Sequence, residues 1–182
     1  MKSPPIPSEV VNEVWDEMHR HSPQTFSAEV ERIVESQPEL FGFLGEAAAG
    51  LSEQAERVAL FMGVAVYRAF EKVLGNRIPE VPGDAIVAAF RNNVASMKPA
   101  AGVDEDSLEE QVFPKRKIDQ PVLVLFVGRC LFGPDEDEPE LPEGNAELLF
   151  LVMKTFIDAL DRHVASRRAK PRRKRKKAPG RV

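Results

Sequence analysis

The sequence predicts an all-α fold, a compact bundle of six or seven helices over residues 8–165 with flexible segments at both ends. Three observations favour this fold class. Apolar residues recur with helical spacing in most segments. The segment 58–67, VALFMGVAVY, is apolar on every face, which is typical of a central helix. Only one run, at 122–127, resembles a strand, and a single strand would have no partner. The 43% of hydrophobic residues is enough to form a core and argues against a disordered chain.

In the first half of the chain, the proline-rich residues 1–7 are expected to form a flexible arm. Ser8 is expected to cap a first helix, whose apolar stripe comprises Val10, Val11, Val14, Trp15 and Met18. A second helix is expected over residues 27–37, with three residues inward: Val30, Ile33 and Val34. A third, short helix begins at Pro38, because a missing N–H costs nothing in a first helical turn, and ends near Gly50. Ser52 then caps the long central helix, which reaches about Leu74.

In the second half, residues 84–97 predict an amphipathic helix with four residues on its inner face: Ile86, Phe90, Val94 and Met97. Ser107 and Glu110 have the spacing of a capping box, so a short helical turn is expected there. The β-branched segment 122–127 is compatible with a buried strand or a helix. The last helix is expected over residues 142–167, with its inner face formed by Leu148, Leu149, Val152, Phe156, Ile157 and Leu160.

An internal duplication is predicted by the pattern Q-P-x-L-x-x-F-x-G-x-x-x-x-G. It occurs from Gln37 to Gly50 and again, 83 residues later, from Gln120 to Gly133. Each copy precedes a long apolar helix, so the repeated units cover about residues 37–75 and 120–165. We expect the inner glycine to allow close backbone approach and the last glycine to end the helix in a left-handed conformation. The first copy contains the helix-forming run 46–49, which favours a helix at 122–127 as well.

The net charge of −4 conceals a division of the chain. Residues 165–182 contain ten of the 25 cations and none of the 29 acids, so the preceding residues carry a net charge of −14. The densest part of this basic segment contains nine cations: Arg167, Arg168, Lys170, Arg172, Arg173, Lys174, Arg175, Lys176 and Lys177. Such runs repel themselves, remain disordered and suit polyanions. We therefore expect residues 166–182 to form a disordered tail that binds nucleic acid or another polyanion, without base stacking because no aromatic residue is interspersed.

Other roles of the charged segments remain open at this stage. The tail also resembles a nuclear localisation signal, which matters only in a eukaryote. A membrane surface or an acidic protein is an alternative partner. The acidic loop at residues 134–143 contains six carboxylates, and the tail could fold back on it and weaken phosphate binding. That loop lacks the spacing and glycine of an EF-hand, and a solvated surface is the plain interpretation.

The sequence contains neither a recognisable targeting segment nor a known catalytic motif, and both observations bear on location and activity. No signal peptide and no apolar run of spanning length is evident, which favours a cytoplasmic location, or a nuclear one in a eukaryote. The lone Cys130 excludes a disulfide framework and reads as a buried small residue. No nucleotide-binding, hydrolase or di-metal motif occurs, so no catalytic residue, metal or cofactor is expected. His19 and His21 read as cations at a helix end.

The leading hypothesis is a non-enzymatic intracellular binding protein. Its acidic body would recognise a protein partner, and its basic tail would hold nucleic acid or another polyanion. A protein-interaction or scaffold domain with an ancillary tail is the first alternative. An enzyme with a pocket inside the bundle is the second.

Overall fold

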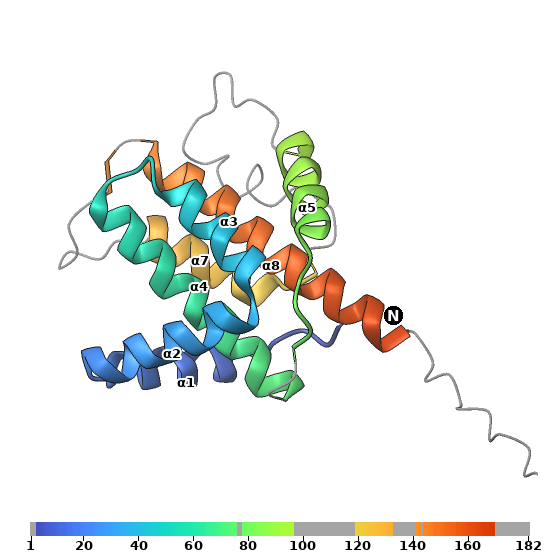
Figure 1. The fold of residues 1–182 in the computed structure, drawn as a ribbon, viewed down its shortest axis with the longest axis horizontal. Coiled ribbons are helices and arrows are strands. Elements are labelled where there is room, and N and C mark those ends of the chain that lie inside the picture. Colours follow the sequence, from blue (N-terminus) through green and yellow to red (C-terminus); the bar gives the residue numbers. More distant parts are fainter. Residues whose placement is uncertain (1–2, 76–77, 97–118, 133–140, 143, 170–182) are drawn as a thin grey trace, which may run out of the picture.

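The structure, a computed structural model, describes residues 3–75, 78–96, 119–132, 141–142 and 144–169, with side chains through Ala165. In this part of the chain all regular structure is α-helical, which confirms the predicted fold class. Figure 1 shows the bundle that the helices form. The described helices are α1 (Ser8–His19), α2 (Pro23–Ser36), α3 (Pro38–Ala48), α4 (Glu53–Leu74), α5 (Gly83–Ser96), α7 (Pro121–Phe132) and α8 (Asn145–Ala169).

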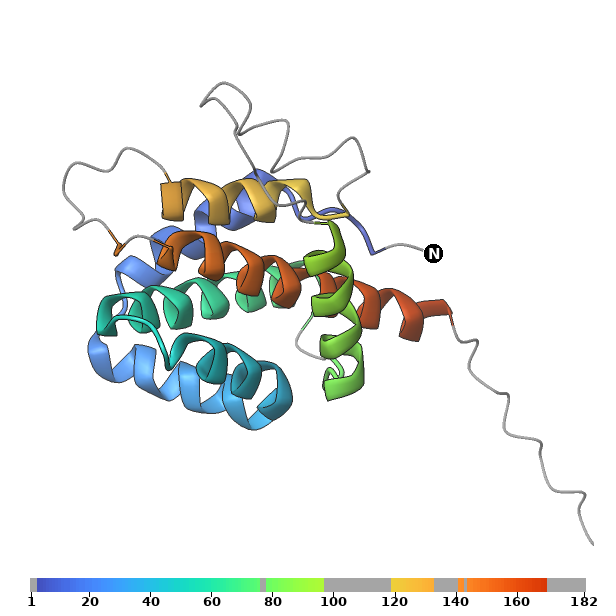
Figure 2. The ribbon, with the colours of Figure 1, turned by 90° about the horizontal axis from the view of Figure 1, so that it is seen from above.

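The two longest helices, α4 and α8, lie side by side at the centre of the bundle (Figures 1 and 2). Helix α4 is buried on nearly every side along the predicted apolar segment, as expected for a central helix. Helix α1 packs on α4, and α5 packs across α8. Helix α3 contacts both central helices, and α7 packs on α8 and α1.

Helix α2 begins four residues before the position that the sequence predicts. Ser22 caps it by accepting a hydrogen bond from the Thr25 backbone N–H at 3.1 Å, and Pro23 occupies the first turn. A serine followed by proline favours a helix start, which accounts for the earlier beginning of α2. Of the two expected caps, Ser52 accepts a hydrogen bond from the Ala55 backbone N–H at 3.2 Å, whereas Ser8 is itself the first residue of α1 and no side-chain cap is present at Pro7.

The described glycines of the repeated pattern, Gly45, Gly50 and Gly128, do not have the predicted roles, and a Cβ at Gly128 would make only an ordinary contact, 3.9 Å from Phe150 Cε2. Gly45 has no atom within 4 Å of where a Cβ would lie, and positive φ occurs, among the described residues, only at Gly75 and Gly144. Gly50 is therefore not a left-handed cap, and Gly133 lies outside the described residues. The close approach occurs instead at Gly63 of α4, where a Cβ would lie 2.5 Å from Leu44 Cδ2 of α3.

Most predicted inward residues are buried, but three are exposed: Val34 (37%), Val94 (46%) and Leu148 (39%). On α5 the buried stripe runs through Ile86, Ala89 and Asn93 rather than through Val94. Asn93 tolerates burial because its amide donates to Thr155 Oγ1 at 3.2 Å and its carbonyl accepts from Lys154 at 3.0 Å. The segment 122–127 is helical within α7, as the repeat predicts, whereas Met97 and the expected turn at Ser107 lie outside the described residues.

The two glutamines of the repeated pattern are buried and bind extended segments in the same manner. Gln120 Oε1 accepts from the Ile6 N–H at 2.9 Å, and its Nε2 donates to the Pro4 carbonyl at 3.2 Å. Gln37 Oε1 accepts from the Val81 N–H at 2.9 Å, and its Nε2 donates to the Pro79 carbonyl at 3.2 Å. Each glutamine thus pairs with a residue's N–H and with the carbonyl two residues earlier.

The sequence predicts a flexible arm at residues 1–7, but the structure shows the described part of this segment packed against the bundle. Residues 3–7 lie against the bundle, and the Ile6 side chain is 1% exposed. Ser3 donates a hydrogen bond to the buried carboxylate of Asp161 in α8, and Gln120 Nε2 donates to the same oxygen at 2.6 Å. The N-terminal segment is therefore part of the packed structure from Ser3 onward.

Candidate functional site

The nine residues predicted to bind polyanions divide at the end of α8. This helix runs to Ala169, so Arg167 and Arg168 lie in its last turn, although the sequence predicts a tail from residue 166. That end of α8 extends beyond the other helices (Figures 1 and 2). The remaining seven lie outside the described residues: Lys170, Arg172, Arg173, Lys174, Arg175, Lys176 and Lys177.

The acidic segment 134–143 also lies outside the described residues, apart from Leu141 and Pro142. Leu141 packs against the hydrophobic core. Gly144 follows with a φ of 81°, a conformation that glycine adopts without strain. Helix α8 then begins at Asn145, three residues after the predicted start.

A pocket lined by aromatic side chains lies where α1, α2, α4 and α7 meet. Its volume is about 660 Å³. The rings of Trp15 in α1, Phe61 in α4 and Phe126 in α7 meet edge to face, with centroids 5.3 Å apart for Trp15–Phe61 and 5.2 Å apart for Trp15–Phe126. Phe26 of α2 stacks on Phe61 at 5.8 Å. All four rings line the pocket and are only partly buried.

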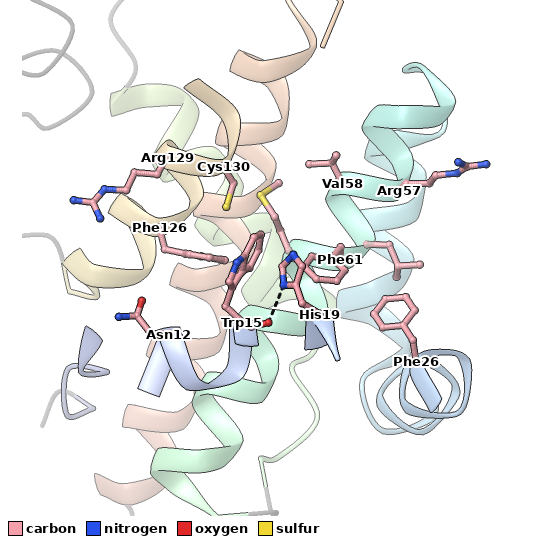
Figure 3. Close-up of a pocket in the computed structure, with 12 residues that line it drawn as sticks. Asn12, Trp15, His19, Phe26, Arg57, Val58, Phe61, Phe126, Arg129 and Cys130 are labelled. Atoms are coloured by element: carbon pink, nitrogen blue, oxygen red, sulfur yellow. Dashed lines mark hydrogen bonds between the residues drawn. The ribbon is translucent and has the colours of Figure 1, made fainter. Parts of the chain in front are cut away.

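Polar side chains lie at the edges of this pocket, and in Figure 3 the guanidinium groups of Arg57 and Arg129 are directed away from the rings. Arg129 of α7 and Arg57 of α4 lie on opposite sides of the opening, and Asn12 of α1 lies below Arg129 in that view. Helical spacing places these side chains beside the rings, because Asn12 precedes Trp15 by three residues and Arg57 precedes Phe61 by four. Both arginines are exposed.

His19 contributes a ring nitrogen to the same pocket. Its Nδ1 lies 2.8 Å from the Trp15 carbonyl oxygen. Because a carbonyl oxygen only accepts, Nδ1 carries the hydrogen, and Nε2 remains available to another partner. The imidazole also contacts the Trp15 ring at 4.4 Å and the Phe61 ring at 5.3 Å. His19 thus lies in the last turn of α1, as the sequence predicts, and it also lines the pocket.

Ion pairs fix the helices that carry the pocket. Lys72 of α4 donates to Glu13 and Glu17 of α1, each at 2.8 Å, and Arg68 donates to Glu17 at 3.1 Å. Arg68 also donates to Glu29 of α2, near which His21 Nδ1 lies at 3.4 Å. These contacts connect α1 and α2 to α4 on the side of α4 away from its packing with α8.

The same network shifts three titrating groups. The hydrogen bond from Lys72 holds the pKa of Glu17 below its ordinary value. The two hydrogen bonds from Arg32 to Glu71, both 2.8 Å, raise the pKa of the Arg32 guanidinium. Burial lowers the pKa of Lys72, but its hydrogen bonds to Glu13 and Glu17 outweigh this effect and raise the pKa. All three groups therefore remain charged over a wider pH range in the folded state.

The sequence interpretation assigned the pocket residues to packing and missed the pocket itself. The sequence places Trp15 on the inner stripe of the first helix, and the apolar surroundings of Phe61 and Phe126 in the chain are equally typical of core residues. The spacing of Trp15 and His19, four residues apart, indicates a shared helix face but not what lies opposite. Among the described residues, no group of three or more His, Cys, Asp or Glu side chains is arranged to hold a metal ion.

Comparisons with known proteins identify no relative: no family model, no curated protein and no solved structure matches the chain. Of the helices that the structure describes, none has both the length and the apolar character needed to cross a membrane.

Proposed function

We propose that the chain is an intracellular, non-enzymatic binding protein that holds nucleic acid or another polyanion through its basic C-terminal segment. The observation that carries this proposal is the uneven distribution of charge along the chain. Residues 165–182 contain ten cations and no acid, whereas the preceding residues carry a net charge of −14. The end of α8 supports it, because Arg167 and Arg168 lie on a helix that extends beyond the bundle.

Binding would follow from counterion release. Each phosphate that a Lys or Arg neutralises releases condensed counterions, so affinity falls steeply with salt and depends little on nucleic-acid sequence. The acidic body would disfavour contact with phosphate elsewhere and confine the nucleic acid to the tail. The same body, with its net charge of −14, suits a protein partner with a basic surface.

We also propose that the body is an internal duplication that includes more than the repeated pattern. In α1 the buried residues are Val11, Val14 and Met18, and α5 buries Ile86, Ala89 and Asn93 with the same spacing. Helix α1 contacts α4 and α7, and α5 correspondingly contacts α8 and α3. The two glutamine contacts support this correspondence, since each joins one half to the other.

The tail hypothesis is tested with a full-length variant in which seven residues are replaced by glutamine: Lys170, Arg172, Arg173, Lys174, Arg175, Lys176 and Lys177. The matched control keeps these residues but scrambles the order of 170–177. We expect the unsubstituted protein to bind duplex DNA and RNA, and to lose about 1,000-fold in affinity between about 50 and 200 mM salt. The scrambled control should retain this binding, and the glutamine variant should lose it.

The alternative of a scaffold domain with an ancillary tail gives a different result. In that case the unsubstituted protein does not bind nucleic acid at low salt, or the glutamine variant binds as tightly as the original. A protein partner would then be captured equally by both forms. Fluorescence anisotropy with labelled duplexes and a pull-down from the source cell distinguish the two outcomes.

A further inference from the structure

We propose that the aromatic pocket between α1, α2, α4 and α7 is a binding site for a small planar aromatic molecule that carries an acidic group. This inference is independent of the proposed polyanion binding, because it rests on residues of α1, α2, α4 and α7 and not on the basic tail. Its volume of about 660 Å³ lies within the range of small-molecule sites, about 300–1,000 Å³.

The rings select a flat apolar ligand. Trp15, Phe61 and Phe126 belong to three different helices and meet at 77–87°. A planar molecule entering the pocket can contact the face of one ring and the edges of the others, which are the favoured aromatic geometries. The rings are only partly buried, so the ligand would cover apolar surface that is now exposed to water.

The charged side chains at the edge of the pocket determine which sign of charge a ligand should carry. An aromatic box can also recognise a cation through ring faces. Among the described residues, however, the pocket lining includes Arg57 and Arg129 and no aspartate or glutamate, in a body that is otherwise strongly acidic. A cation would meet a guanidinium group on either side of the opening, and only Arg57 has a carboxylate beside it, the exposed Glu53. A carboxylate or phosphate would instead accept charge-assisted hydrogen bonds from an arginine.

The two arginines are available for this role. Arg129 has no ion pair in the part of the chain that the structure describes. Arg57 pairs with Glu53 one turn earlier on α4, but these side chains are 77% and 79% exposed. An exposed pair on a helix contributes only about 0.3–0.5 kcal/mol. An anionic ligand can therefore compete with Glu53 for Arg57.

Aromatic packing between helices does not by itself require polar side chains beside the rings. Phe90 of α5 and Phe43 of α3 make a comparable edge-to-face contact, with centroids 6.1 Å apart. The exposed positions on α5 beside that contact are apolar, Val87 and Val94. In the pocket, α1 instead presents Asn12 and His19, whose Nε2 can bond a polar ligand atom.

The chain's single tryptophan, Trp15, lies in the pocket and reports occupancy directly. We would titrate the full-length protein with naphthoate and with neutral naphthylmethanol, following Trp15 emission and the heat of binding. Naphthoate is expected to bind at one site, change Trp15 emission and bind about tenfold more tightly than the alcohol. Because the two arginines lie on opposite sides of the opening, at least one of Arg57→Gln and Arg129→Gln should weaken naphthoate binding about tenfold, and neither should change binding of the alcohol.

The matched control is Arg91→Gln, since Arg91 is an exposed arginine of α5 outside the pocket. This variant should bind naphthoate with unchanged affinity, and all three variants should retain the thermal stability of the original. The proposal is overturned if the alcohol binds as tightly as naphthoate, if neither pocket arginine affects naphthoate affinity, or if naphthoate binds without changing Trp15 emission. Failure of nucleic-acid binding would leave this result unaffected.

Discussion

Glu17 accepts hydrogen bonds from Arg68 and Lys72 of α4, and the Lys72 contact lowers its pKa. A carboxylate with a lowered folded-state pKa stabilises the fold above its unfolded pKa and loses that contribution as the pH falls through the folded value. We expect Glu17→Gln to lower the free energy of unfolding at neutral pH by about 1 kcal/mol. It should also reduce the loss of stability on acidification below pH 4.5, the ordinary glutamate pKa.

Denaturant titrations at a series of pH values measure both effects. Glu9→Gln is the matched control, because Glu9 is exposed on the same helix and makes no ion pair within the described part of the chain. Its expected effect on the free energy of unfolding is within about 0.5 kcal/mol. If the two variants show the same pH dependence, the contact between Glu17 and Lys72 does not contribute to stability.

At the scale of the helix, three serines at observed helix starts differ in their capping contacts. Ser22 and Ser52 accept hydrogen bonds from backbone N–H groups three residues later, at 3.1 and 3.2 Å. Ser8 makes no capping bond, since α1 begins at Ser8 itself. We expect Ser22→Ala and Ser52→Ala each to lower the free energy of unfolding by about 1 kcal/mol, and Ser8→Ala to change it by less than about 0.5 kcal/mol. Chemical denaturation of the three variants tests this ranking, which an equal loss at Ser8 would contradict.

The sequence predicts which helices exist better than where each begins and which side faces inward. The apolar periodicity of α4 and the first-turn prolines of α3 and α7 are local signals, and those helices lie where the sequence places them. The inner face of α5 depends on a distant contact, the pairing of Asn93 with Thr155 in α8. Periodicity favours Val94 there because it weighs side-chain polarity and cannot detect a partner 62 residues away.

The pocket could not be predicted for the same reason. Its rings come from four helices, and each ring alone reads as a core residue. The basic segment is the opposite case, because its charge is a property of composition that needs no folded partner. Local signals therefore identify the tail, whereas the pocket exists only once α1, α4 and α7 are packed together.

At the scale of the whole molecule, the two buried glutamines connect two halves of the chain, one from residue 3 through α4 and the other from residue 78 through α8. Each half provides one glutamine that binds the other half. Gln37, in the first half, binds residues 78–81 of the second, and Gln120, in the second half, binds residues 4–6 of the first. Since α4 and α8 also bury their apolar faces on each other, neither half completes its core alone. The halves should consequently unfold together as one cooperative unit.

Gln37→Ala and Gln120→Ala test this coupling. Each substitution leaves a buried backbone N–H and a carbonyl without their partner, so we expect each to lower the free energy of unfolding by about 2–4 kcal/mol. Gln24→Ala, an exposed glutamine of α2, should cost less than about 0.5 kcal/mol. Because the coupling runs in both directions, circular dichroism and Trp15 fluorescence should still give coincident unfolding transitions in each variant. Separate transitions, with the Trp15 signal unaffected by Gln37→Ala, would show that the halves are independent units.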